Sequence, residues 1–194
     1  MSEPHEEQAI LNRSSVGFWI YLMTDCLLFA SLFATFAVLR NATAGGPAGS
    51  DIFELPLVLT ETVILLLSSF TCGMALLGLK TKNIRQIFIA LGATYILGVA
   101  FLSIEVAEFA KLISEGHSWQ QSAFLSAFFT LVATHGLHIL AGLIWLVVLV
   151  VVLSRKGITP KFARQLTLFG LFWHFLDLVW IFIFTVVYLM GVAA

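Results

Sequence analysis

The sequence predicts an all-α, polytopic membrane protein: a bundle of five transmembrane helices. Of its 194 residues, 60% are hydrophobic and only 11% are charged, a balance that separates it from soluble globular domains. Apolar segments longer than the ~20 residues needed to cross a bilayer alternate with short connections that are polar or rich in Gly and Pro. We expect a polar segment over residues 1–15 and a single transmembrane domain over 16–194, with spans at roughly 16–39, 52–79, 84–113, 122–153 and 162–192.

The segments between the spans set their limits. Residues 1–15 are polar and acidic and lack the basic flank and cleavage site of a signal peptide, so we expect the N-terminus to be retained. Residues 41–51 are dense in Gly, Ala and Pro and cannot continue a helix, whereas Pro56 is tolerated in the first turns of the second span. Polar turns separate the later spans at residues 80–85, 114–118 and 154–161.

The fourth span, residues 122–153, carries the clearest internal pattern. Its only titratable side chains are two histidines, His135 and His138, which lie near its middle. Small or polar residues recur at every fourth position and share one slowly turning face, namely Ser122, Ser126, Thr130, Thr134, His138 and Gly142. We expect this face to contact other helices and the remaining faces to contact lipid.

The distribution of basic residues predicts the orientation. With five spans, the N-terminus and the connections after spans two and four share one side, which holds eight Lys and Arg residues, against two on the other side. Basic connections resist translocation. We therefore expect the N-terminus in the cytoplasm and the C-terminus on the periplasmic side.

Charge and cysteine content narrow the possible partners. The net charge is -1 and no basic run is present, so nucleic acid is not expected as a partner. Cys26 and Cys72 both lie inside apolar segments, where thiols pack as small apolar groups. We expect neither a disulfide nor thiol chemistry.

The predicted spans contain a set of acidic and histidine residues: Asp25, Glu61, Glu105, Glu108, His135, His138, His174 and Asp177. A charge at the bilayer centre costs roughly 2.5–3.5 kcal/mol, so each must pair, bind a proton or face a wet or protein-lined space. At ~1.5 Å per residue, His138 and Asp177 lie at similar depth and can meet. His174, next to Trp173, lies one turn from Asp177 on the same face. Asp25 lies nearer the cytoplasmic end, apart from this cluster.

Three roles remain open for these side chains. They can form interhelical hydrogen bonds that fix helix packing, worth about 0.6 kcal/mol each. Histidines at matched depth on facing helices can ligate a b-type haem. A haem needs a broad apolar slot, however, and the carboxyls of Glu61, Glu105 and Asp177 lie at a similar depth. A metal site is the weakest alternative, because the E-x-x-E and H-x-x-H spacings of spans three and four differ from the Glu-x-x-His pairs of di-iron bundles.

Asp25 has two interpretations of its own. As a neutral acid it can simply hydrogen-bond to Thr24 or to a neighbouring helix. As a functional group it can exchange protons or lie beside an oxygen channel. The residue alone does not separate these interpretations.

Four motifs together resemble subunit III of the haem-copper oxidases. They are GFWIYLMTD at 17–25, FLSIEVAEF at 101–109, THGLH at 134–138 and WHFLDLVW at 173–180, in matching order and spacing over nearly the whole chain. Many cytochrome c oxidases have seven helices in this subunit, whereas five are expected here. That number, with residues 45–47 and 51–56, resembles the cytochrome bo-type ubiquinol oxidases of bacteria.

The resemblance implies an accessory subunit of the bacterial inner membrane, without catalytic or metal-binding residues and without a cofactor. It would dock on catalytic subunit I, which carries the haems and copper, in a complex with subunits II and IV. That oxidase reduces oxygen to water with electrons from a quinol and pumps protons. The resemblance also implies a V-shaped cleft that holds phospholipids.

The resemblance assigns roles to some of the intramembrane residues. Asp25 corresponds to a carboxylate on the side facing the catalytic subunit, where many members have Glu. The helix-packing role falls on Glu105, His135, His138, His174 and Asp177. We therefore expect a cofactor-free scaffold that stabilises the catalytic subunit. The alternatives are a stand-alone proton-coupled transporter, disfavoured because no inverted repeat is seen, and a haem b membrane anchor.

Overall fold

In a computed structural model of the chain, which describes residues 3–45 and 55–193, all regular secondary structure within the described ranges is helical. Five helical spans in these ranges are long and apolar enough to cross a membrane: Ser15–Leu39, Leu55–Lys80, Ile84–Ser114, Ala123–Lys156 and Pro160–Val192. The predicted all-α fold with five membrane-crossing helices is therefore confirmed. The predicted start of the second span at residue 52 and most of the 41–51 connection lie outside the described residues.

The helices follow the predicted segments closely, except at the N-terminus. The first span is observed at Ser15–Leu39, and its helix begins earlier than the span, at Glu3. The elements are α1 (Glu3–Leu39), α3 (Leu55–Lys80), α4 (Ile84–Ser114), α5 (Ala123–Lys156) and α6 (Pro160–Ile183), which continues into a π-helix, η1 (Phe184–Leu189), and α7 (Met190–Ala193).

Local sequence signals fix the helix starts. Asn83, Ser122 and Thr159 each cap the following helix, the side-chain oxygen accepting a hydrogen bond from the backbone N–H three residues later. Such caps satisfy backbone donors that would otherwise lack partners. Pro160 directly after its cap is preorganised for the first turn of α6. At the other end of α5, Gly157 adopts φ 66°, a left-handed conformation that ends the helix.

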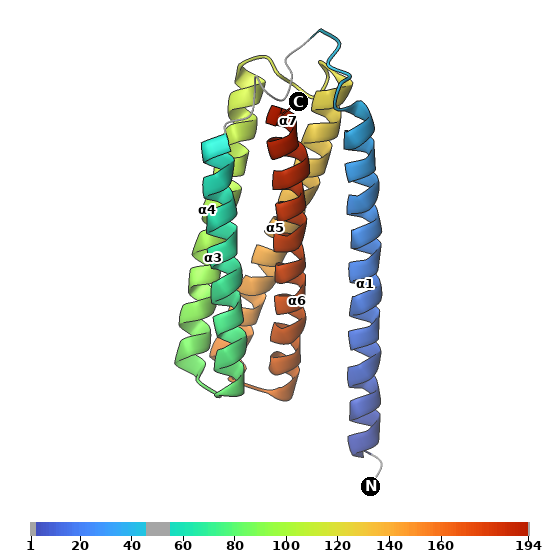
Figure 1. The fold of residues 1–194 in the computed structure, drawn as a ribbon. Coiled ribbons are helices and arrows are strands. Elements are labelled where there is room, and N and C mark those ends of the chain that lie inside the picture. The colour runs from blue at the N-terminus through green and yellow to red at the C-terminus, as the bar shows by residue number, and fades with distance from the viewer. Residues whose placement is uncertain (1–2, 46–54, 194) are drawn as a thin grey trace.

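The helices α3, α4, α5 and α6 form a bundle, and α1 packs on one edge of it, mainly against α5 and also against α6. Figure 1 shows α1 along one side, with the α3–α4 hairpin at the opposite side. The N-terminus and the tight α3–α4 and α5–α6 connections lie at the same end of the molecule, and the C-terminus lies at the other end (Figure 1).

Two tryptophans fasten α6 to α3. The indole N–H of Trp173 donates to the Ser68 hydroxyl, and that of Trp180 donates to the Thr62 hydroxyl, each at 3.1 Å. Both rings are buried. Trp173 fits there because α5 has Gly142 beneath it: a Cβ at that position would lie 2.7 Å from the Trp173 Cζ3 atom.

The small and polar face of α5, which we expected to contact other helices, is buried along only part of its length. Ser122 and Gly142 are buried, but Thr130 is exposed and its hydroxyl donates to the Ser126 carbonyl oxygen of its own helix. Thr134 donates likewise to the Thr130 carbonyl oxygen. Because a hydroxyl satisfied by its own helix needs no partner across an interface, this middle part of the face stays on the surface of the chain.

Candidate functional site

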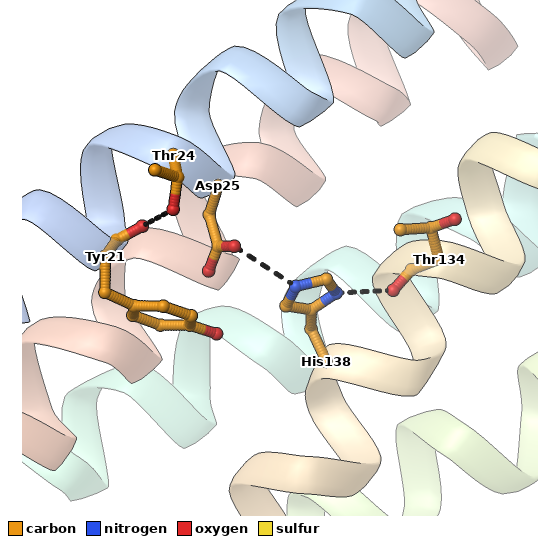
Figure 2. A network of polar contacts seen from close by, with 5 residues as sticks. All are labelled: Tyr21, Thr24, Asp25, Thr134 and His138. Carbon is orange, nitrogen blue, oxygen red and sulfur yellow. Dashed lines mark hydrogen bonds and ion pairs between the residues drawn. The ribbon is translucent and has the colours of Figure 1, made fainter.

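Asp25 of α1 and His138 of α5 form the polar contact between these two helices. Figure 2 shows the Asp25 carboxylate aimed at the imidazole, with 3.7 Å between Oδ1 and Nε2. The Nδ1 of His138 donates to the Thr134 carbonyl oxygen at 2.7 Å. Since that carbonyl can only accept, the proton on Nδ1 is fixed and Nε2 faces the carboxylate.

This contact corrects the expectation that Asp25 stands apart from the histidines. It also corrects the alternative in which Asp25 bonds to Thr24, because the Thr24 hydroxyl donates to the Tyr21 carbonyl oxygen instead, at 2.7 Å. Asp25 is 6% exposed, and the Tyr21 side chain lies beside it (Figure 2). The depth comparison failed because α1 and α5 extend to different lengths beyond their apolar portions.

Three glutamates gather on the opposite side of the bundle. Glu61 of α3 and Glu105 and Glu108 of α4 are buried, at 0%, 2% and 7% exposure, and lie within electrostatic reach of one another. The Glu105 carboxylate packs on α5, 3.1 Å from where a Cβ on Gly136 would lie. Tyr188, from η1, lies within electrostatic reach of all three carboxyl groups.

His135 lies in an aromatic environment rather than in a polar network. The ring is fully buried, packs at 5.3 Å between centroids against Trp180, and meets Phe101 edge-on at 6.0 Å. Phe29 of α1 approaches from the other side. Neither ring nitrogen has a hydrogen-bond partner among the described residues. His135 therefore joins α5 to α6, α4 and α1 through ring packing.

The predicted group around Asp177 forms in part. Asp177 interacts with His174 one turn away and with Ser69 of α3, while His138 is directed to Asp25 and Thr134. His174 is exposed on the surface of the chain, whereas its neighbour Trp173 is buried. Asp177 thus belongs to the α3–α6 interface, and His138 to the α1–α5 interface.

The polar residues therefore divide into interhelical contacts and one acidic cluster. Across residues 3–45 and 55–193, no three His, Cys, Asp or Glu side chains are grouped in a way that would hold a metal ion. Sequence reasoning did not single out Tyr188, Ser68, Ser69 or Thr62. Ser68 and Thr62 lie six residues apart on α3, and the partnered tryptophans lie seven apart on α6, so the two hydrogen bonds lie about two helical turns from each other.

Comparison with known proteins identifies the family. Residues 3–192 match the family model described as cytochrome c oxidase subunit III. The chain is 57% identical to the cytochrome bo(3) ubiquinol oxidase subunit 3 of Pseudomonas aeruginosa over 175 residues, 90% of this chain and 84% of that one. It is 43% identical to the quinol oxidase subunit 3 of Bacillus subtilis, covering 97% and 93% of the two chains. It is also 43% identical to the cytochrome c oxidase subunit 3 of Bacillus sp. strain PS3, covering 91% and 85%. The chain belongs to the cytochrome c oxidase subunit III family.

Proposed function

We propose that this chain is the cofactor-free accessory subunit of a proton-pumping terminal quinol oxidase of aerobic respiration, which reduces oxygen to water. Its similarity to subunits named for ubiquinol and quinol oxidases over most of their lengths carries this proposal. The catalytic subunit I would hold the haems and copper, with subunits II and IV completing the complex. Oxidation of the quinol would occur outside this chain.

The scaffold role is supported by the way polar groups are used in the bundle. Trp173 and Trp180 fix α6 to α3 through buried hydrogen bonds, and Asp25 with His138 ties α1 to α5. Side chains that tie helices together give the catalytic subunit a rigid surface on which to dock. The contribution of this chain is then the stability of the complex during turnover.

A lipid-holding cleft between α1 and α6 belongs to the same proposal. A groove of about 200 Å³ separates these helices and is lined by apolar side chains from both, among them Phe29, Phe33 and Phe182. Its lining suits an acyl chain of a membrane phospholipid, because it offers no partner for a polar group. The two helices that line this groove are α1, at the edge of the bundle, and α6 (Figure 1).

We place the chain in the bacterial inner membrane with its N-terminus in the cytoplasm. The end of the molecule that carries the N-terminus also carries the α3–α4 and α5–α6 connections (Figure 1). Those connections contain most of the basic residues, which remain on the cytoplasmic side. Asp25 then lies in the helix at the edge of the bundle, where a proton or oxygen path of the neighbouring subunit would pass.

The proposal is tested by purifying the complex through a tag on this chain, in mild detergent. We expect larger hydrophobic subunits to co-purify, with b- and o-type haem absorbance and cyanide-sensitive oxygen consumption with ubiquinol. A complex that lacks this chain should lose activity faster during turnover than the full complex. If it assembled and kept its activity equally well, the scaffold role would be wrong.

The same purification distinguishes the two alternative functions, a transporter and a haem b anchor. A colourless chain that comes out alone and drives proton-coupled uptake in liposomes would identify a transporter. A haem spectrum in the isolated chain would identify a haem b anchor.

A further inference from the structure

The acidic cluster of Glu61, Glu105 and Glu108 is not explained by helix packing. A packing contact would satisfy its polar atoms, yet both carboxyl oxygens of Glu61 and both of Glu105 have no hydrogen-bond partner among the described residues. Both side chains are more than nine-tenths buried. Buried polar groups are normally satisfied, so such atoms indicate that something else binds there.

The surroundings identify what can bind. The titratable groups around the cluster are Tyr188 from η1, the three carboxyls themselves, from α3 and α4, and Lys111 of α4, which lines the same groove as Glu108. His135 of α5 is directed into aromatic rings instead. Three mutually repelling carboxylates cannot remain charged together in a buried site, and the described residues form no metal-holding group. The ligand with the right charge and size is the proton.

The cluster borders a groove at Glu108. Glu108 lines a groove of about 360 Å³ that runs along α4 and also contains Ser103, Ala107, Lys111 and Glu115. Lys111 and Glu115 lie in the last turn of α4 and directly after it. The groove therefore connects the inner carboxyls, through Glu108, with the end of the helix where water is available.

The π-helix supports this arrangement. The η1 segment lies at residues 184–189, inside the fifth span, and its wider turns carry the fully buried Tyr188 toward the carboxyl groups. Short π-helical segments are rare and occur frequently at functional sites.

We propose that Glu61, Glu105 and Glu108 form a proton-binding site that exchanges protons with the medium through the groove beside Glu108. In this site Glu61 and Glu105 hold the bound protons, and Glu108, which lines the groove, is the group through which a proton enters or leaves. The inference goes beyond the scaffold role, and its test measures protonation rather than oxidase turnover.

Infrared spectroscopy of the intact oxidase complex tests the protonation. At about pH 7 an exposed glutamate, with an ordinary pKa of about 4.3, gives carboxylate bands, whereas a protonated carboxyl gives a separate C=O stretching band. We expect wild-type minus variant spectra of Glu61→Gln and Glu105→Gln each to contain that C=O band. Glu115→Gln, an exposed residue of the same groove, is the matched control and should remove carboxylate bands only. Loss of carboxylate bands in both buried variants would overturn the proposal.

Isotope exchange tests the route and needs no change to the carboxyls. Transfer into heavy water shifts the C=O band to lower frequency as the bound protons exchange. We expect Ala107→Phe, which fills the groove, to slow this shift several-fold. Ala110→Phe, at an exposed position of α4 away from the groove, should leave its rate unchanged. If the isotope shift were equally fast in the two variants, the groove would not be the route by which protons exchange.

Discussion

Adding one methyl group at Gly142 should lower the stability of the helical bundle. In Gly142→Ala the new Cβ would lie 2.7 Å from Cζ3 of Trp173 and 3.2 Å from Cε1 of Phe172, against the ~3.5–4.0 Å of ordinary carbon contacts. Trp173 is held in place, because its Nε1 donates to the Ser68 hydroxyl and its ring stacks on Phe169 with 5.4 Å between centroids. Overpacking of this kind costs about 1–3 kcal/mol.

The assay is the midpoint temperature at which the purified complex loses oxidase activity. At about 2–4 °C per kcal/mol for a chain of this size, Gly142→Ala should lower the midpoint by several degrees. Gly73→Ala is the matched control, because nothing lies within 4 Å of a Cβ there. Both substitutions gain up to ~1 kcal/mol of helix propensity, so their difference isolates the clash. Equal midpoints for the two variants would refute the close packing described here.

Three further predictions follow from single contacts. Thr62→Val should cost about 1–3 kcal/mol because the buried indole N–H of Trp180 loses its acceptor, and Thr62→Ser, which keeps the hydroxyl, should retain the wild-type midpoint. Asp25→Leu should weaken the packing of α1 on the bundle by about 0.6–1.7 kcal/mol. The measurement is the rate of protease cleavage near the N-terminus, which should rise. Asp25→Asn is the control, because it keeps a group that can donate to His138. Ser122→Ala removes the α5 cap and should lower stability by about 1 kcal/mol, measured by the same thermal midpoint. A midpoint unchanged by Thr62→Val or Ser122→Ala would contradict the corresponding contact.

The fold was predictable because hydropathy and helix breakers act locally. The third span, expected over 84–113, is observed as Ile84–Ser114, and the fourth, expected over 122–153, begins at Ala123 after its Ser122 cap. The first span, expected over 16–39, is observed as Ser15–Leu39, but its helix begins at Glu3, because apolar content marks the membrane-crossing part only. Residues from Glu3 onward are polar yet helix-compatible, so the helix extends through them.

The candidate site was predictable in its residue types but not in its pairings. Depth along a helix is counted from the end of its apolar span, and α1 begins at Glu3, well before its span at Ser15. The count therefore separated Asp25 from His138, although the two lie 3.7 Å apart. Tyr188 was missed for another reason: a π-helix changes which face a residue occupies, and an α-helical spacing does not foresee it.

The interfaces between the helices differ in how many polar contacts hold them together. The α3–α6 interface has two buried indole hydrogen bonds, and α3 and α4 share a 2.8 Å bond between Thr71 and Thr94. In contrast, α1 is held by apolar and aromatic packing together with the Asp25–His138 contact. Local opening begins where few interactions must break. A perturbation at Asp25 should therefore release α1 while the four-helix bundle stays folded, whereas one at Trp173 or Trp180 should affect the bundle itself.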